Sequence, residues 1–190
     1  PPGFAVTAGE LTFDGLDLIA LPAAKRRQLL GKRIAFVPQE PMTALNPVRS
    51  IGSQFNEHLK RLSVRGARAR RELALKFLSE VHLPDAKSLL GKYPHQLSGG
   101  MCQRVLIALA FAGDPALVVA DEPTTALDVM TQARIMSLIA EMQKLHGTAM
   151  ILITHDLRLA AHVCDRILVM YAGDVVESSD ARKLLADPRH

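Results

Sequence analysis

Two short, uninterrupted apolar runs with one helical segment between them constrain the fold of this chain most strongly. The runs are ALVVA at 116–120 and AMILI at 149–153, and an amphipathic pattern occupies 128–146. Strands that are apolar at every position are typical of parallel sheets whose two faces are both covered by helices. A third run, RIAFVP at 33–38, has the same character. The sequence therefore predicts an α/β fold with a parallel sheet.

The segment after RIAFVP, between this run and ALVVA, has a helical pattern. From about residue 50 to residue 90 the pattern is helical, with apolar residues at Leu73, Phe77 and Leu78 at the spacing of an amphipathic helix. No good strand interrupts these residues, so we expect a helical insertion. Before them lies QEPMTALNP at 39–47, whose prolines favour a structured loop over the interior of a helix or strand.

Shorter elements flank the α/β region on both sides. ELTFDGLDL at 10–18 predicts two short strands joined at a glycine turn, and 22–30 predicts a brief basic helix. Near the other end, RILVMY and DVVES meet at Ala172 and Gly173. This pattern predicts a second hairpin.

Composition argues against two functions, nucleic-acid binding and spanning of a membrane. The formal net charge is +4, with basic clusters at 25–27 and 65–71. A nucleic-acid patch is one interpretation, but the second cluster opens an amphipathic helix, and a solvated helix face explains it better. Aromatic residues make up only 4% of the chain, which leaves few platforms for base stacking. No apolar run approaches the about 18 residues that span a bilayer, so we expect any membrane contact to go through a partner.

Polar residues follow the predicted strands at positions that should meet. Gln39 follows the first strand, Asp121 and Glu122 follow the second, and His155 follows the third. Right-handed crossovers bring such strand ends to one edge, which is where open α/β sheets bind ligands. The turn at 98–100, Ser-Gly-Gly, opens a helix and is expected at the same edge. Each feature alone has a plain explanation as a helix cap, a solvated strand end or a packing histidine, and only their combination points to a site.

Together these motifs resemble an ATP-binding-cassette ATPase, the nucleotide-hydrolysing subunit of membrane transporters. The matching segments are Gln39 for the Q-loop, LSGGM at 97–101 for the signature, LVVADEP at 117–123 for Walker B, TALD at 125–128 for the D-loop and THD at 154–156 for the switch histidine. The resemblance covers essentially residues 10–188. VPQEPMTALNP, YPHQLSGGM and ADPRH are similar to the dipeptide, oligopeptide and nickel importer subfamily.

The resemblance implies a role for each residue beside the sheet. Asp121 would hold Mg²⁺, a hard cation suited to carboxylate oxygen. Glu122 would orient or deprotonate the attacking water, and His155 would contact the γ-phosphate. Gln39 is neutral and can both donate and accept, so it would touch Mg²⁺ and water. The catalytic set is therefore Glu122, His155 and Gln39, with ATP and Mg²⁺ as cofactors.

The resemblance also implies partners and a location. Ser98, Gly99 and Gly100 would bind ATP held by a second cassette, identical or different, and Asp128 would contribute from the D-loop. The subunit would hydrolyse ATP to energise import of peptides or similar small solutes through transmembrane permease subunits. A periplasmic or extracellular solute-binding protein would take part indirectly, and nucleic acid would not. The expected location is peripheral, at the cytoplasmic face of the cell membrane.

The same resemblance divides the chain into parts of a P-loop-type ATPase. Residues 1–48 would form N-terminal strands and the Q-loop of the core, 49–96 a helical subdomain, and 97–190 the signature helix and the C-terminal core. The Walker A pattern, Gly-x₄-Gly-Lys-Ser/Thr, is missing from all 190 residues. The resemblance implies that this N-terminal part is absent, that Pro1 lies just beyond it, and that the 190 residues alone are inactive.

The signature segment departs from the family pattern at two positions. Met101 replaces the usual signature glutamine, and Cys102 stands where these importers typically carry a basic residue, so we expect weaker electrostatics at the turn.

The sequence leaves two alternative functions open. One alternative is a degenerate cassette that donates only its signature turn to a complete partner. The other is a cassette ATPase acting on DNA or ribosomes. Only 58 residues separate Gln39 from Ser98, which favours a compact helical block that docks onto a membrane subunit.

Overall fold

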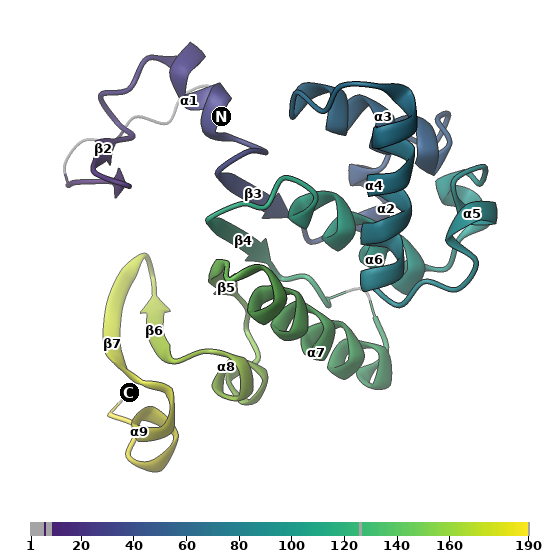
Figure 1. Cartoon of the computed structure of the whole chain (residues 1–190). Coiled ribbons are helices and arrows are strands. Elements are labelled where there is room, and N and C mark those ends of the chain that lie inside the picture. Colours follow the sequence, from purple (N-terminus) through teal and green to yellow (C-terminus); the bar gives the residue numbers. More distant parts are fainter. Residues whose placement is uncertain (1–5, 7–8, 126, 190) are drawn as a thin grey trace.

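The computed structural model of the chain describes residues 6, 9–125 and 127–189 (Figure 1). Pro1, beside which the missing part was expected, and Ala126 of the TALD segment lie outside the described residues. None of the helices in these ranges is long and apolar enough to cross a membrane.

A three-stranded parallel sheet forms the centre of the fold, as the apolar runs predict. The strands are β3 (Ile34–Val37), β4 (Leu117–Asp121) and β5 (Ala149–Ile153), in the order β3-β4-β5 (Figure 1). Val37 is in register with Ala120, and Asp121 with Ile153. Since all three strands run in the same direction, their carboxyl ends lie at one edge of the sheet.

Helices cover one face of this sheet and leave the other face open. Ala35, Val37, Val118 and Ala120 are buried, whereas Phe36 is 56% exposed. On the same open face, Ile151 and Ile153 are 51% and 48% exposed. The prediction that both faces are covered is therefore wrong for the described residues, because the helices around the sheet pack on a single side.

The main packing element is α6 (Gly99–Phe111), which is apolar nearly all round. Its buried residues are Cys102, Gln103, Val105, Leu106, Ile107, Ala108, Ala110 and Phe111. It packs against β3, and it also contacts α3, α4 and α7 (Val129–His146). A helix buried on several sides joins the sheet and the helices around it into one core.

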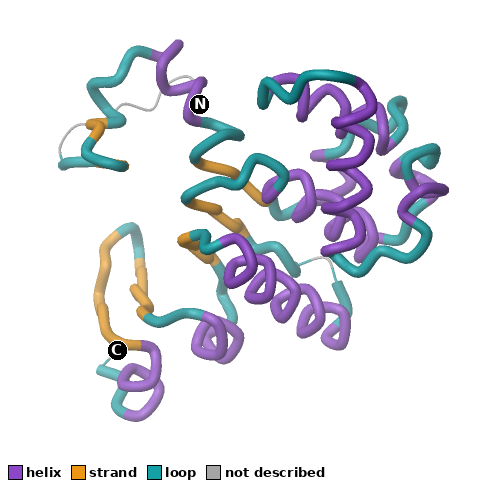
Figure 2. The backbone as a smooth tube through the Cα atoms, viewed as in Figure 1, coloured by secondary structure: helices purple, strands orange, loops and turns teal. Residues whose placement is uncertain are grey.

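Between β3 and α6 the chain is helical, as predicted. The elements are α2 (Pro41–Ala44), α3 (Ile51–Arg61), α4 (Ala67–Glu80), α5 (Ala86–Leu89) and the 3₁₀ turn η1 (Pro94–Gln96). Ile51, Phe55 and Leu59 form the buried stripe of α3 at a helical spacing. The expected loop at 39–47 contains the one-turn helix α2, which begins at Pro41 because proline suits the first helical position. Figure 2 shows these helices gathered beside the central strands.

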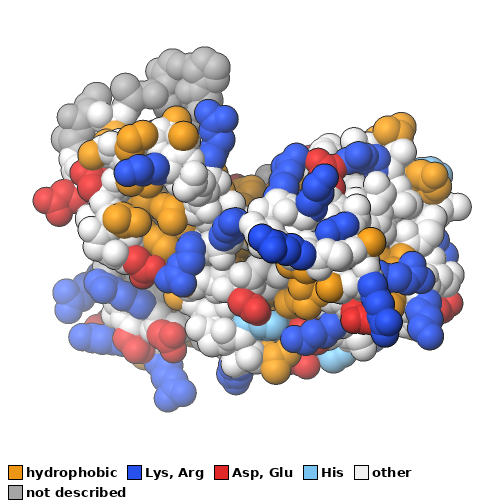
Figure 3. All heavy atoms as spheres, turned by 45° about the horizontal axis from the view of Figure 1, so that its top comes forward, with side chains coloured by type: hydrophobic (Ala, Val, Ile, Leu, Met, Phe, Trp, Pro, Cys, Tyr) orange, Lys and Arg blue, Asp and Glu red, His pale blue; other side chains and the backbone are white. Residues whose placement is uncertain are grey.

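The remaining elements form two hairpins and three short helices. They are β1 (Thr12–Phe13), β2 (Leu16–Asp17), α1 (Ala23–Leu29), α8 (Leu157–Val163), β6 (Arg166–Tyr171), β7 (Asp174–Asp180) and α9 (Ala181–Ala186). Ala172 and Gly173 both have positive φ, as a tight hairpin turn requires. Both predicted hairpins are confirmed, and each is a sheet of its own. Figure 1 places the two hairpins at the left, and Figure 3 shows hydrophobic side chains at the surface on that side.

One buried histidine connects three helical segments of the core. The His146 side chain, at the end of α7, is only 7% exposed and stacks on Phe77 of α4 with ring centroids 5.4 Å apart. It also contacts Phe111 of α6. Its Nδ1 lies 2.9 Å from a carboxylate oxygen of Asp114, and its Nε2 lies 3.2 Å from one of Glu80. His146 therefore contributes both ring packing and polar pairing at this junction.

We predict that His146→Ala lowers the free energy of unfolding by about 2–4 kcal/mol. The substitution leaves a cavity between two aromatic rings and removes the partners of two carboxylates. Chemical denaturation followed by circular dichroism measures this loss. His162→Ala on α8, where the residue is exposed, is the control and should change the free energy by less than about 0.5 kcal/mol. Equal effects of the two substitutions would contradict the role given to His146.

We also predict that the chain self-associates through the open face of its sheet. Contiguous exposed apolar surface favours association, and Phe36→Ser or Ile151→Ser should weaken it. Leu145→Ser, on the exposed side of α7, should leave association unchanged. Sedimentation velocity over a range of concentrations measures the effect. A monomer with a sharp, reversible melt that does not depend on concentration would show the prediction to be wrong.

Candidate active site

The chain turns sharply where β4 ends, and the turn places a carboxylate at the sheet edge. Asp121 is the last residue of β4, and Glu122 follows with φ of 41°, in the left-handed region. That conformation costs a non-glycine residue on the order of 1–2 kcal/mol. The backbone N–H of Glu122 donates to the carbonyl of Ile153, 2.9 Å away, which anchors the turn to the end of β5. Such strain, held by the surrounding structure, is common at functional sites.

The Glu122 carboxylate is the centre of a polar cluster, which we call the Glu122 cluster. Gln39 Nε2 donates to its Oε2 over 3.1 Å, and Thr125 Oγ1 donates to the same oxygen over 2.6 Å. His155 Nδ1 lies 3.1 Å from its Oε1. Gln39 follows β3, Thr125 follows β4 and His155 follows β5, so the segments after all three parallel strands contribute. The structure thus brings together Gln39, Glu122 and His155 as the sequence predicts.

These contacts favour the ionised form of Glu122. The hydrogen bond from Thr125 and then the one from His155 hold the pKa of Glu122 below its usual value. The side chain is 25% exposed, so solvent reaches it, while the His155 side chain is 73% exposed. In the part of the chain that the structure describes, His155 Nε2 has no hydrogen-bond partner. The cluster therefore presents a carboxylate that can accept a proton and an imidazole that can contact a ligand.

Thr125 is the residue of this cluster that sequence reasoning missed as a site residue. It belongs to the predicted D-loop segment, in which the resemblance implies a role only for Asp128. Its position three residues after Glu122 is the available signal, because a tight turn after a strand brings such residues together. The backbone N–H of Thr125 donates to the carbonyl of Glu122 over 3.2 Å, which is that turn.

The Ser-Gly-Gly turn lies at the start of α6. Ser98 caps this helix, since its Oγ accepts from the backbone N–H of Met101 over 3.3 Å. Ser98 and Gly99 are exposed. A Cβ added at Gly100 would lie 3.1 Å from Thr131 Cγ2 on α7, so the absence of a side chain allows the two helices to approach closely. The first two residues of the turn therefore face solvent.

Asp128 belongs to the same side of the molecule as this turn. It caps α7 by accepting from the Thr131 backbone N–H over 3.0 Å and from the Thr131 hydroxyl over 2.7 Å. The hydroxyl bond and then the backbone bond lower the pKa of Asp128. The expectation that the Ser98–Gly100 turn lies at the same sheet edge as the Glu122 cluster stays a prediction. The turn lies beside the start of α7, since a Cβ added at Gly100 would approach Thr131 of that helix.

Cys102 has a packing role in the structure. Its side chain is fully buried and its Sγ lies 3.6 Å from the Pro94 carbonyl, so it fixes α6 against η1. Burial raises the pKa of this thiol. The weaker electrostatics expected at the turn remain a prediction, since the structure shows only that this side chain points into the core.

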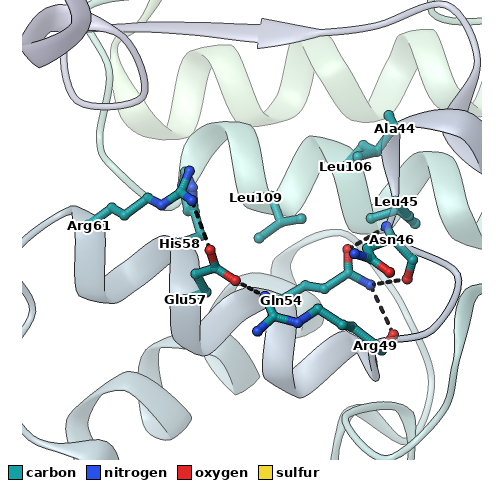
Figure 4. Close-up of a pocket in the computed structure, with 10 residues that line it drawn as sticks. All are labelled: Ala44, Leu45, Asn46, Arg49, Gln54, Glu57, His58, Arg61, Leu106 and Leu109. Carbon is teal, nitrogen blue, oxygen red and sulfur yellow. Dashed lines mark hydrogen bonds and ion pairs between the residues drawn. The ribbon is translucent and has the colours of Figure 1, made fainter.

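A cleft of about 390 Å³ lies beside α2, α3 and α6 (Figure 4). The Gln54 amide lines this cleft. It accepts from the Asn46 N–H and donates to the carbonyls of Asn46 and Arg49, at 2.9–3.1 Å. Glu57 pairs with both Arg49 and Arg61 along one wall. Burial lowers the pKa of His58, which also lines the cleft. Since α2 directly follows the loop of Gln39, this cleft, the α3 cleft, is connected by sequence to the Glu122 cluster.

Comparison with known proteins gives the family. The ABC transporter family model matches residues 3–125, and this chain belongs to that family. It is 48% identical, over 97% of its length, to the dipeptide transport ATP-binding protein DppD of Haemophilus influenzae. It is 43% identical, over its whole length, to the oligopeptide transport ATP-binding protein OppD of Bacillus subtilis. The chain spans 56% of the first relative and 53% of the second.

Solved structures confirm the P-loop NTPase-like cassette fold. The dimeric post-hydrolysis state of the ATP-binding cassette MJ0796, bound to ADP and Pi, is 31% identical with a TM-score of 0.79. That comparison covers 93% of this chain and 75% of the other. The cassette cbiO1 from Clostridium perfringens, part of the transporter complex cbiONQ, is 27% identical with a TM-score of 0.80. It covers 95% of this chain and 69% of the other.

We predict that the Glu122 cluster stabilises the fold in a pH-dependent way. The pKa of Glu122 is lower in the folded chain than its ordinary value of 4.5. The stabilisation by the ionised carboxylate is therefore present above about pH 5 and lost as the pH falls through the lowered pKa. Unfolding free energies of the unsubstituted chain and of Glu122→Gln, measured between about pH 3 and 7, should converge toward low pH. A difference that grows on acidification would contradict the assigned pKa direction.

Proposed function

We propose that this chain is part of an ATP-hydrolysing subunit that energises import of peptides or similar small solutes. The observation that supports this most is the Glu122 cluster, in which an ionised carboxylate, an amide and an imidazole meet at the carboxyl edge of a parallel sheet. This edge is where open α/β sheets bind ligands. The substrate class follows from the relatives, which are named as dipeptide and oligopeptide transport ATP-binding proteins.

In the proposed reaction, Glu122 acts on the attacking water. Its carboxylate accepts a hydrogen bond, or the proton, from a water that attacks the γ-phosphorus, and the bond to the leaving ADP oxygen breaks. In its imidazolium form, His155 donates its Nδ1–H to Glu122 and its Nε2–H to the γ-phosphate, where negative charge develops. Thr125 and Gln39 hold the carboxylate in position. Phosphoryl transfer depends mainly on such positioning and on neutralising charge.

Mg²⁺ would reach this site together with ATP. The described residues contain no group of three or more His, Cys, Asp or Glu side chains that could hold a metal ion. Mg²⁺ in nucleotide sites is bound through one or two carboxylates together with phosphates and water. Asp121 at the end of β4 and the Oε1 atom of Gln39 fit that requirement. When bound, the cation neutralises charge on the phosphates.

We propose that the second nucleotide contact is made in trans. Ser98 caps a 13-residue helix that begins at Gly99 and Gly100. Gly100 lies beside Thr131, whose backbone N–H Asp128 caps. An exposed helix N-terminus with small residues suits a phosphate. We infer that its ligand is an ATP held by a second cassette, as the resemblance to ATP-binding cassettes implies. The solved relative MJ0796 is described as dimeric.

The membrane partner is proposed to dock at the α3 cleft. Two arginines, the acceptor Glu57 and half-buried His58 line this hollow on the predicted helical subdomain, residues 49–96. The loop that follows Gln39 leads directly into it. A permease segment seated there would sense movement of that loop as γ-phosphate is bound and released. The subunit would then lie peripherally at the cytoplasmic face of the membrane, with a solute-binding protein acting indirectly.

The degenerate half-site cassette is the alternative that an experiment must separate. The assembled Glu122 cluster favours a catalytic subunit, because a cassette that only donates its turn has no use for it. The 190 residues contain no Gly-x₄-Gly-Lys-Ser/Thr loop, so we expect no turnover of Mg·ATP from this chain by itself.

The test is ATP turnover in a complete cassette that carries these residues together with a phosphate-binding loop. Glu122→Gln should lower turnover by about 10²–10⁴-fold, because it removes the proton acceptor, and should leave ATP binding intact. Glu141→Gln is the matched control, since Glu141 is exposed on α7 and pairs only with His82 within the described ranges. Phosphate release and nucleotide binding are measured in parallel. Unchanged turnover in Glu122→Gln would contradict the proposal and favour the half-site alternative.

A further inference from the structure

A second cleft, of about 540 Å³, opens between α3, α4 and α5. It shares no lining residue with the α3 cleft, because it uses the other face of α3. The side chains that matter in its lining are three cations, Arg70, Arg71 and Lys87, and three hydroxyls, Ser50, Ser53 and Ser88. We call it the basic cleft. Its volume is in the range of small-molecule sites.

The charge of this cleft has no counter-ion in the described structure. No Asp or Glu is among its lining residues. Glu57 pairs with arginines of the α3 cleft, Glu72 with Arg68 and Glu80 with Lys76. Asp85, outside the lining, caps α5 by accepting from the backbone N–H of Ser88 over 3.3 Å. Within the described ranges, neither Arg71 nor Lys87 has a hydrogen bond or an ion pair through its side chain. Two cations in the lining therefore have no direct side-chain partner, and the nearby carboxylate of Asp85 is occupied by the backbone of α5.

Arg70 is held in position beside these two cations. Its Nε donates to Asn56 Oδ1 over 2.6 Å, and its Nη1 donates to the Val64 carbonyl over 3.0 Å. The side chain is half-buried. Both contacts fix the guanidinium plane and leave Nη2 available, so little side-chain entropy is lost when an anion binds.

The lining also limits the kind of anion. It contains no aromatic side chain, and its apolar members are Ala67, Ala74 and Leu90. A nucleobase would find no stacking partner there. Three cations and three hydroxyls instead match the oxygen-rich, multiply charged surface of a phosphate group.

We propose that the basic cleft binds a compact phosphate-bearing anion, separate from the ATP that the Glu122 cluster serves. The phosphate groups pair with Arg70, Arg71 and Lys87 and accept hydrogen bonds from the serine hydroxyls. The ligand is either a free phosphorylated metabolite or the headgroup of an anionic phospholipid, which share this chemistry.

The test is isothermal titration of the chain with pyrophosphate at low ionic strength. The double variant Arg71→Gln/Lys87→Gln should bind at least about tenfold more weakly, since it removes two charge-assisted contacts. Arg68→Gln is the control for the loss of one positive charge on α4, because Arg68 shares that helix with Arg71 and lies outside the lining. All three substituted side chains are solvent-accessible, and circular dichroism checks that the variants fold.

Sedimentation with phosphatidylglycerol vesicles, against phosphatidylcholine vesicles, separates the two sources. Binding to the anionic vesicles that pyrophosphate displaces and that the double variant loses identifies a lipid headgroup. Pyrophosphate binding without vesicle binding identifies a free metabolite. The proposal is overturned if the unsubstituted chain does not bind pyrophosphate at millimolar concentration, or if all variants bind equally. Binding of polyglutamate in preference to pyrophosphate would also overturn it, in favour of an acidic protein partner.

Discussion

The hydrogen bonds to the Glu122 carboxylate are the interaction on which the rest of the site depends. Glu122 leaves β4 in a left-handed conformation, and its N–H is tied to the carbonyl of Ile153 on the neighbouring strand. A carboxylate in this position can accept from donors that follow each of the three strands. The parallel sheet is what makes this geometry available, because only parallel strands end at one edge. Without that edge, Gln39, Thr125 and His155 would have no common acceptor.

The structure presents two groups of polar residues that suit different tasks. The Glu122 cluster suits activation of water. Ser98, Gly99 and Asp128 lie at the starts of α6 and α7, where backbone N–H groups and a capped helix suit a phosphate. In the proposed function, one group of each kind, from two different cassettes, completes a site. The buried helix α6 extends from the Ser98 turn into the core that supports the sheet.

Much of this arrangement could be predicted from the sequence because it depends on local chemistry. The apolar runs predict the parallel strands, and the polar residues directly after them predict Gln39, Glu122 and His155 at one edge. Coverage of both sheet faces could not be predicted correctly, because it depends on which helices pack against Phe36 and Ile151. Thr125 was missed because its role depends on a backbone turn rather than on residue type. The close approach of Gly100 to Thr131 could not be predicted, because it depends on how α6 packs against α7.

The central claim is that the Glu122 cluster of one cassette works with the Ser98 turn of another. Complementation in trans tests it most directly. Complete cassettes carrying Glu122→Gln and Ser98→Arg are paired in one assembly through different affinity tags, and ATP turnover is measured. The mixed pair should regain turnover that neither variant has alone, because one of its two sites has both an intact Glu122 and an intact Ser98. Turnover in a pair of unsubstituted and doubly substituted cassettes, with none in the mixed pair, would contradict the account.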